Sequence, residues 1–512
     1  MNELSTTQKI TALVLLLAGV AMLIIGWTTN APDEFHVYWM ATTAALLCGG
    51  LMLTGLTGVR LATRISRVVV GSVFIVSGLI KANDTVGFSY KLEEYFDESA
   101  LGSFWAMFFD FALPIAMIVT VVEVILGLAV LFGAKARLTN IVLLLMTLFF
   151  GWLTWYTATC NDAQTAAMSA GESFNKVCVN DCGCFGDALR GSVGRSLTPW
   201  ESFYKDLTLL FFVIVLVVES ARIKLNSIRQ DIGIFIAALA IIAAFGGWLF
   251  GWWFPMGFTI IAALIYLILK QFVLYKHIEW IIAAAMVVLT FAFVFYTYMH
   301  LPIKDYRPYA VGKNITDQMK SAEELGLEPT IYANIYVLKH KETGETITEF
   351  SNVYLEQKMW NEWEVESASD ESVVVQRGYE PPIPVFSVSN EDGEDIGMEI
   401  LEREGFSFIV IAYDIHKTNE GIQPQVNEFA KMAEEDGIPF FGITSSAYND
   451  VEAFRHENQN IFPYYNADEI FLKTIIRSNP GLLLMENGTV LGKWHFNDFP
   501  EYREIKANHL ID

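Results

Sequence analysis

Four of the five cysteines gather in one short polar stretch between apolar runs. They are Cys160, Cys178, Cys182 and Cys184. Cysteine is the residue of disulfide exchange and a ligand of zinc and iron–sulfur clusters, so this cluster predicts chemistry in the loop 159–202. The fifth cysteine, Cys48, stands alone in an apolar run, where burial keeps a thiol neutral and makes it behave as a small hydrophobic residue.

Disulfide exchange is the first interpretation of this loop. A thiolate is the attacking group, and the Cys182-Gly183-Cys184 triplet places two sulfurs around a permissive glycine. A bond that joins these two sulfurs directly is expected to be strained and therefore oxidising. Cys160 and Cys178 could then form a second pair that relays oxidising equivalents.

Two other interpretations stay open. Two structural disulfides could hold a long loop in place without any redox role. Four thiolates could instead bind zinc or an iron–sulfur cluster, but their spacing lacks the paired Cys-x-x-Cys pattern of such sites. Thiols outside the cytoplasm are also more often oxidised than bound to metal, so no metal is expected.

The elements that must position these cysteines are membrane helices. A bilayer core needs about 20 apolar residues in a helix, and the first three-fifths of the chain offers nine windows of roughly that length. They are 9–27, 38–58, 66–82, 104–132, 138–158, 203–220, 232–252, 256–275 and 278–299. We expect about nine spans, the first being a retained helix rather than a cleaved signal peptide.

Basic residues predict how these spans are oriented, because Lys and Arg in short loops are held in the cytoplasm. They follow the second, fourth, sixth and eighth windows, whereas the intervening loops are acidic or neutral. The N-terminus is therefore expected in the cytoplasm, and the cysteine loop and the C-terminal region in the periplasm of an inner-membrane protein. Disulfides persist in that compartment.

The net charge of −23 argues against nucleic acid as a partner, because phosphate binding requires clustered Lys and Arg. We expect the acidity to keep an exported domain soluble. The lipid bilayer is the one partner that the composition requires.

Several segments together resemble the MauE branch of the DoxX-like membrane proteins, over residues 62–222. They are Val-Ser-Gly-Leu-Ile-Lys-Ala-Asn-Asp at 76–84, Leu-Pro at 113–114, Glu-Val-Ile-Leu-Gly-Leu-Ala at 123–129, Cys-Gly-Cys-Phe-Gly at 182–186 and Lys-Asp-Leu at 205–207. The resemblance implies a four-helix membrane bundle that acts with a thioredoxin-like partner in disulfide formation during maturation of exported proteins. The whole chain also resembles large DoxX-related proteins of Bacteroidota, which carry an extra C-terminal domain. Relatives of the DoxX type accompany quinone oxidoreductases, which implies a quinone as a possible cofactor.

Charged residues inside spans are costly and therefore informative. Glu123 stands near the middle of the fourth window, whereas Lys81 and Asp110 stand nearer the outer ends of their windows. They could form a buried polar cluster. Glu123 could serve a structural hydrogen bond between helices or belong to a quinone or proton path.

After His300 the composition becomes polar, which predicts a domain boundary near 300. The β-rich region 301–380 is expected to contain a hairpin that turns at 341–345. Residues 381–512 then alternate between strand and helix patterns, which predicts a small α/β domain. Upstream, the prediction places two helices in 1–61 and three more in 223–300.

The α/β domain resembles a thioredoxin-like fold of the TlpA type, with one departure. Where that family carries Cys-x-x-Cys, this chain has Asp414-Ile-His-Lys-Thr-Asn. Ser-Asn479-Pro480-Gly resembles the cis-proline position of the family, which implies a cis bond before Pro480. Without thiols, the resemblance implies a docking surface around Asp414, Asn479 and Pro480 rather than dithiol chemistry.

The leading hypothesis is an inner-membrane component of thiol–disulfide exchange, with an exported protein or a thioredoxin-like protein of the periplasm as partner. The alternatives are a non-enzymatic scaffold of a larger envelope complex with structural disulfides, and a quinone-linked oxidoreductase subunit.

Overall fold

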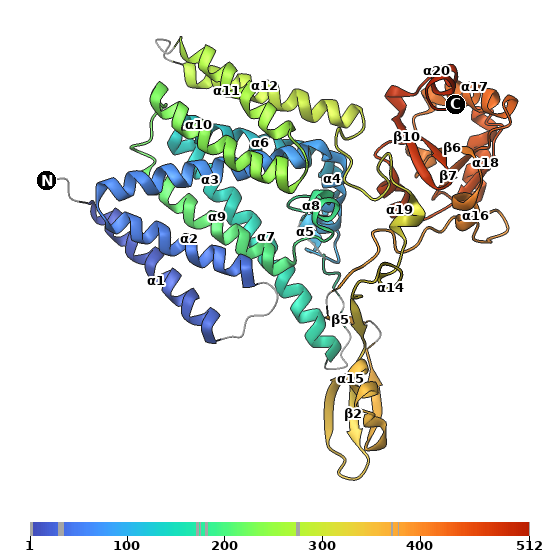
Figure 1. The fold of residues 1–512 in the computed structure, drawn as a ribbon, viewed down its shortest axis with the longest axis horizontal. Helices are drawn as coiled ribbons and strands as arrows, with labels where there is room; N and C mark the ends of the chain where they lie inside the picture. The colour runs from blue at the N-terminus through green and yellow to red at the C-terminus, as the bar shows by residue number, and fades with distance from the viewer. Residues whose placement is uncertain are drawn as a thin grey trace. The chain divides into compact units, whose positions relative to one another are not determined.

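The computed structural model describes residues 4–28, 35–169, 174, 176–179, 183–272, 277–369, 372–376 and 378–510. The chain divides into two compact units, a helical unit that ends at Phe295 and a second unit that begins at Tyr296. Figure 1 shows the elements of each unit.

In the part of the chain that the structure describes, the helical unit is built from α-helices α1 to α12, the last of which extends beyond Phe295, and from two short segments of other helix type. The helices are α1 (Thr6–Thr28), α2 (Phe35–Leu53), α3 (Leu56–Asn83), α4 (Thr85–Phe96), α5 (Ser103–Ala106), α6 (Ala112–Phe132), α7 (Ala136–Ser169), α8 (Asp187–Val193), α9 (Pro199–Glu219), α10 (Ile228–Ile242), α11 (Phe254–Lys270) and α12 (Ile278–Met299). The short segments are the 3-10 turn η1 (Phe109–Phe111) and the π-helical turn η2 (Ala243–Leu249).

Within the described residues, seven helical segments are long and apolar enough to cross a membrane. They are α1, α2, α3, η1 with α6, α7, α10 with η2, and α12. The two other expected windows are also helical, but α11 is shorter, and α9 carries four charged residues among its 21. A multi-pass membrane protein is therefore supported, whereas the count of nine spans stays a prediction.

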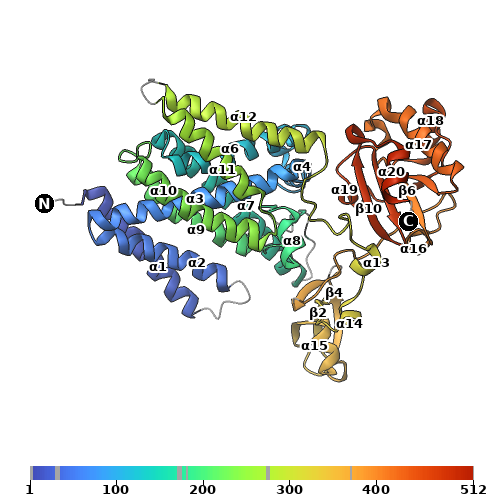
Figure 2. The same cartoon turned by 45° about the horizontal axis from the view of Figure 1, so that its top comes forward.

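Helix α3 lies at the centre of the bundle and packs against α2, α6, α9 and α10 (Figures 1 and 2). Its contact with α6 depends on glycines. A Cβ atom at Gly71 would lie 2.6 Å from Leu131 Cδ2, and one at Gly127 would lie 2.8 Å from Gly71 O. Small residues let helix backbones approach closely in a membrane, so this sequence of α3 and α6 favours a tight helix pair.

The second unit contains a five-stranded sheet in the order β10-β9-β6-β7-β8. Its strands are β6 (Phe406–Ile411), β7 (Phe440–Thr444), β8 (Tyr464–Asn466), β9 (Gly481–Glu486) and β10 (Thr489–His495). Strands β6, β7 and β8 are parallel, whereas β9 and β10 run antiparallel to their neighbours. An α/β domain is thus present where strand and helix patterns alternate.

Helices cover both faces of this sheet because alternate strand residues point to opposite sides. Phe408 of β6 packs with α17 (Gln423–Glu435), α18 (Tyr448–Asn458) and α20 (Tyr502–His509), whereas Ile409 packs with α16 (Gly397–Glu402) and α19 (Glu469–Ile475). The sheet core is therefore apolar on both sides.

A smaller β module precedes this domain. Strands β2 (Ile335–His340) and β3 (Thr346–Phe350) form the predicted hairpin, and β4 (Trp363–Ala368) completes a sheet in the order β3-β2-β4. A ribbon of β1 (Ile331–Ala333) and β5 (Val373–Gln376) flanks it. The remaining helices are α13 (Ile315–Gln318), α14 (Ala322–Leu325) and α15 (Ser351–Glu356).

Candidate functional site

A cavity of about 260 Å³ lies inside the helical unit. Its wall is mostly apolar and comes from α3, α4, α5, α6, α7, α9, residues Leu101 and Phe108 beside α5, and the segment 184–185. Nine aromatic residues of the described chain line this wall: Phe74, Phe88, Tyr95, Phe96, Trp105, Phe108, Phe149, Phe150 and Phe185. Binding sites for small molecules are typically concave and apolar with a few polar groups, so this cavity is the leading candidate site of the chain.

A buried ion pair lies in the cavity wall. Lys81 Nζ of α3 is 2.7 Å from Glu123 Oε2 of α6, and only 5% and 4% of the two side chains are exposed. Lys81 Nζ also donates to Ser77 Oγ at 3.1 Å and lies 5.3 Å from the ring centroid of Phe150. Charges in a membrane interior require partners, and Lys81 and Glu123 supply each other with one.

The expected polar cluster is therefore present in part. Glu123 links α6 to α3 through Lys81, which agrees with a structural role, and it lies beside a cavity, which agrees with a place in a quinone or proton path. Asp110 is exposed in η1 and lies outside the pair, because η1 precedes the buried part of α6.

A second ion pair of the cavity wall comes from the Lys-Asp-Leu segment at 205–207, which carries part of the family resemblance but was assigned no role from the sequence. Lys205 Nζ lies 2.9 Å from Asp206 Oδ1, and Thr154 Oγ1 donates to Asp206 Oδ2 at 3.2 Å. Lys205 Nζ also lies 5.4 Å from the ring centroid of Phe185. The signal that could have revealed this pair is a doublet of opposite charges near the start of an apolar window.

Cys184 contributes to the same wall. Its carbonyl oxygen accepts a hydrogen bond from Ser77 Oγ at 3.2 Å, which holds the segment against α3. Gly183 and Gly186 have positive φ angles of 60° and 49°, a conformation that favours glycine. Cys184 is disulfide-bonded, and Cys182 lies outside the described residues.

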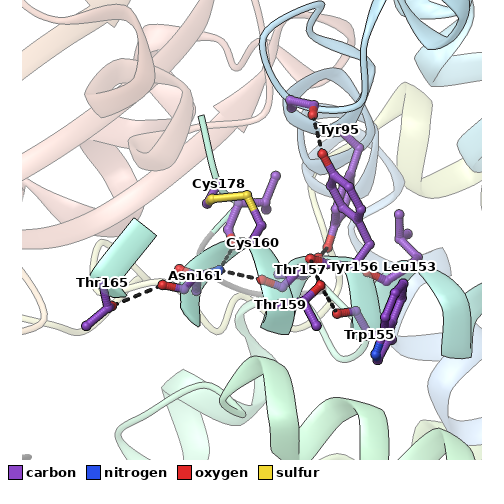
Figure 3. The surroundings of a disulfide bond; sticks show 12 residues. Tyr95, Leu153, Trp155, Tyr156, Thr157, Thr159, Cys160, Asn161, Thr165 and Cys178 are labelled. Atoms are coloured by element: carbon purple, nitrogen blue, oxygen red, sulfur yellow. Dashed lines mark hydrogen bonds between the residues drawn. A yellow bond between two sulfur atoms is a disulfide. The ribbon is translucent and has the colours of Figure 1, made fainter. Parts of the chain in front are cut away.

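The Cys160–Cys178 disulfide has different surroundings (Figure 3). Its Cα atoms are 5.7 Å apart, and Cys160, in α7, is 7% exposed. The neighbouring Asn161 Nδ2 donates to the carbonyl oxygen of Val179 at 3.0 Å, and Val179 packs in a buried cluster with Tyr95. The pairing predicted for Cys160 and Cys178 is confirmed, and their bond joins α7 to a segment that is fixed by other contacts.

Cys48 is free and buried, as its apolar surroundings predict. Among the residues that the structure describes, no three His, Cys, Asp or Glu side chains are arranged to hold a metal ion.

In the second unit, the loop that follows β6 packs against the residue before Pro480. Asn479 Nδ2 donates to the carbonyl oxygen of Asp414 at 2.7 Å, and Thr418 Oγ1 donates to Asn479 Oδ1 at 2.7 Å. The Asn479–Pro480 bond is cis, as expected. Sequence reasoning thus located two segments that meet in space although more than 60 residues separate them.

The exposure of these residues limits what a docking surface can use. Asn479 is 8% exposed and Pro480 is buried, so they support the loop from inside. The exposed residues of the loop 414–419 are His416, Lys417 and Asn419. Lys417 Nζ lies 3.1 Å from Asp414 Oδ2, and this hydrogen bond raises the pKa of Lys417.

The turn after β10 contacts the end of α12, a feature that the sequence did not reveal. Asn497 Nδ2 donates to the carbonyl oxygen of Met299 at 2.8 Å, and His300 Nδ1 lies 2.7 Å from Asp498 Oδ2. The Phe496 N–H donates to Ser478 Oγ at 3.0 Å, next to Asn479. Burial lowers the pKa of His495 to about 4.

A buried charge cluster fixes the segment after α12 to β10. Asp305 Oδ1 lies 2.7 Å from Arg307 Nε, and Asp305 Oδ2 lies 2.8 Å from Lys493 Nζ. Burial alone would raise the pKa of Asp305, but the two cations outweigh it and hold this pKa well below its usual value. Burial lowers the pKa of Lys493 to about 7.

Residues 59–164 match the family model described as methylamine utilisation protein MauE. The helical unit therefore contains a MauE family domain, which spans α3 to most of α7 and includes Lys81, Glu123 and Cys160. The match leaves out the segment of Cys184 and the whole second unit. No significant match was found among curated proteins, and none among solved structures.

The MauE match and the apolar helices together support a multi-pass membrane protein. The DoxX likeness and the thioredoxin-like assignment of the second unit stay predictions.

Proposed function

We propose that this protein is a membrane component of thiol–disulfide exchange outside the cytoplasm, with Cys184 as the cysteine that faces its cavity. The observation that carries the proposal is the position of Cys184 in the wall of an aromatic cavity that also contains the Lys81–Glu123 pair. A disulfide with a purely structural role does not require a cavity beside it. A disulfide that takes part in exchange requires an electron acceptor, which an adjacent cavity can hold.

The cavity suits a quinone as that electron partner. Its wall combines stacked aromatic rings with two ion pairs, which offer surfaces for a flat ring and polar groups for its oxygens. Phe149 lines the cavity and is also 41% exposed on the outside of α7, next to Trp152. A ligand with an apolar tail could therefore reach the cavity from the lipid.

The proposed reaction has two balanced steps. A dithiol of the partner protein attacks the disulfide of Cys184 and is oxidised to a disulfide, which leaves two thiols on this chain. These two thiols then give two electrons and two protons to the quinone, which becomes a quinol, and the disulfide forms again. Lys205 lies against the residue that follows Cys184, where its charge would stabilise a thiolate.

The second unit is assigned a docking role in this proposal. The loop after β6 has no cysteine, but its exposed His416 and Lys417 side chains remain available to contact an extended peptide of an exported or thioredoxin-like protein. The proposal places the cysteine loop and this unit in the periplasm, with the N-terminus in the cytoplasm, because the basic loops alternate in that sense.

The Cys160–Cys178 bond is assigned a structural role, which modifies the predicted relay. Its residues pack against α7 and the buried cluster around Tyr95, so the bond holds the segment that leads to Cys184.

The proposal is tested by measuring the potential of each disulfide separately. The protein, in detergent, is equilibrated at defined potentials, its thiols are trapped, and the trapped residues are identified by mass spectrometry. We expect the Cys184 bond to be reduced at a potential above about −300 mV and the Cys160–Cys178 bond only below it. If both bonds resist reduction to that value, exchange is excluded and the scaffold function takes its place.

Matched variants separate the cysteines. Cys184→Ser should abolish oxidation of a reduced dithiol peptide by duroquinone, whereas Cys48→Ser, which removes a buried thiol far from the loop in sequence, should leave the rate unchanged. Activity that survives Cys184→Ser would contradict the assignment.

A further inference from the structure

Phe185 follows Cys184 directly and contacts two groups, one from helix α9 and one from the turn between α10 and α11. Lys205 Nζ of α9 lies 5.4 Å from its ring centroid, and the ring of Phe250 lies at a centroid distance of 5.4 Å with an angle of 42° between the planes. Phe250 is 2% exposed. It belongs to the turn between α10 and α11, which lies outside the residues matched by the MauE family.

The backbone of this turn is built to point Phe250 inward. Helix α10 widens into the π-helical turn η2, a form that is rare and re-aims the side chains that follow it. The Phe250 N–H donates to the carbonyl oxygen of Phe245 at 3.0 Å, and Gly251 follows with a φ angle of 59°. A Cβ at Gly247 would lie 2.6 Å from a ring carbon of Trp253, so a larger residue there would displace that ring.

The two glycines around Cys184 explain why such a contact matters. Gly183 and Gly186 give the segment conformational freedom, and a flexible segment needs side chains that fix it. The side-chain contacts of Phe185 supply that restraint on the C-terminal side of Cys184, and the Ser77 hydrogen bond supplies it at Cys184 itself.

Helices α10 and α11 are attached to the bundle by other contacts. Tyr266 of α11 stacks on Phe132 at a centroid distance of 4.1 Å, and Ser72 Oγ of α3 donates to the carbonyl oxygen of Ala238 at 3.3 Å. Asp231 of α10 pairs with Lys270 and accepts from Asn226 Nδ2. Removal of the Phe250 ring should therefore leave these helices in place.

We infer that Phe250 is a positioning residue, through which the α10–α11 turn holds the Cys184–Phe185 segment in the orientation that faces the cavity. The inference rests on the proposed function of Cys184. It assigns a role in that function to helices outside the MauE match.

The test compares Phe250→Ala with Phe235→Ala. Phe235 is a buried aromatic residue of the same helix pair, but it packs on Phe132 and Tyr266. We expect Phe250→Ala to slow re-oxidation of the reduced loop at saturating duroquinone by roughly 10- to 100-fold, with an unchanged half-saturating concentration, because small misplacements of reacting groups are costly. Alkylation of reduced Cys184 should become faster. Phe235→Ala should change neither rate, and Phe250→Leu should restore much of the loss.

A double-mutant comparison makes the test independent of folding defects. Phe185→Ala removes the same contact from the loop side, so Phe185→Ala/Phe250→Ala should be no slower than the slower single variant. Additive losses, or equal effects of Phe250→Ala and Phe235→Ala, would overturn the inference while Cys184→Ser still abolished exchange. Failure of Cys184→Ser to abolish exchange would instead overturn the proposed function.

Discussion

The segment that carries Cys184 and the loop Asp414–Asn419 are both short stretches held against another part of their unit, but they are held by opposite means. The first contains a sulfur, stands in the wall of a cavity and is fixed by groups from α3, α9 and the α10–α11 turn. The second contains no sulfur and is fixed from within by the buried amide of Asn479. One arrangement leaves room for a reacting molecule, whereas the other fills its own interior.

This difference suggests a division of labour. A cavity with paired charges in its wall can hold a small oxidant, and a loop without thiols can offer only polar groups and main chain to a partner. Electron transfer and partner binding would then be sited in different units of the chain. The two sites should also respond differently to mutation, since paired charges in a membrane and neutral hydrogen bonds in a soluble domain have different energetics.

The largest effect is expected at the buried ion pair of the cavity. Lys81→Met leaves Glu123 without its cation, and removal of one partner from a buried pair costs about 3 to 5 kcal/mol. The free energy of unfolding of the helical unit, measured in detergent by chemical denaturation, should fall by that amount. It should be mostly regained in Lys81→Met/Glu123→Leu, because two apolar side chains leave no unpaired charge.

If the double variant is as unstable as Lys81→Met, the unpaired charge of Glu123 is not the cause of the instability. The charged groups of Lys81 and Glu123 would then themselves stabilise the cavity wall, in contrast to the neutral hydrogen bonds of the soluble loop.

A smaller effect is expected from Asn479→Ala in the second unit. This change removes the amide that donates to the carbonyl oxygen of Asp414 and accepts from Thr418 Oγ1, but Thr418 Oγ1 still donates to that carbonyl oxygen at 3.0 Å, so the expected cost is about 1 kcal/mol. Thermal unfolding of the second unit should report it, and His416→Ala, which alters an exposed side chain of the same loop, should change stability little.

The reduction potential of the Cys184 disulfide tests whether the two regions are independent. This potential should be the same in Asn479→Ala and in the unmodified protein, because the two sites belong to different units. A shift in this potential would show that the two regions are coupled and would remove the division of labour.

Local patterns in the sequence were enough to predict several features of this molecule. Apolar windows of adequate length are helices, the alternation around 341–345 is a hairpin, and the MauE resemblance agrees with the family match over α3 to α7. These features depend on periodicity or on short motifs, which are visible along the chain.

The contacts that complete the sites were not visible in this way. Phe250 meets Phe185 across 65 residues, and Asn497 binds the end of α12 across 198. Such contacts depend on how helices and strands pack in three dimensions. The inward direction of Phe250 also depends on a π-helical turn, for which the sequence offers no periodic signal. Asn479 was expected on a docking surface, but the way it packs on Asp414 buries it.

The most gradual effect concerns the pH dependence of the second unit. His495 is 4% exposed, and burial lowers its pKa from 6.5 to about 4. Below pH 6.5 the unfolded chain takes up a proton at this position that the folded domain does not, so stability should fall as the pH falls from about 6.5 to 4, by at most about 1.4 kcal/mol per pH unit. Lys493, whose pKa is lowered from 10.5 to about 7, contributes in the same sense only between those two values, so the two windows do not overlap.

Thermal unfolding of the second unit between pH 7 and 4 measures this slope. His495→Asn is the matched variant, because an amide oxygen can replace Nδ1 as the acceptor for the Asn497 N–H but does not titrate. In this variant, stability should depend less steeply on pH between 7 and 4. His495 directly precedes the turn that binds Met299 and borders Ser478, so this turn is the part of the domain that the pH change should affect. The Cys160–Cys178 bond and the cavity should keep their properties over the same range. A slope that persists in His495→Asn would assign the acid sensitivity to the neighbouring His300–Asp498 pair, and the soluble site would then depend on an exposed contact rather than on a buried ring.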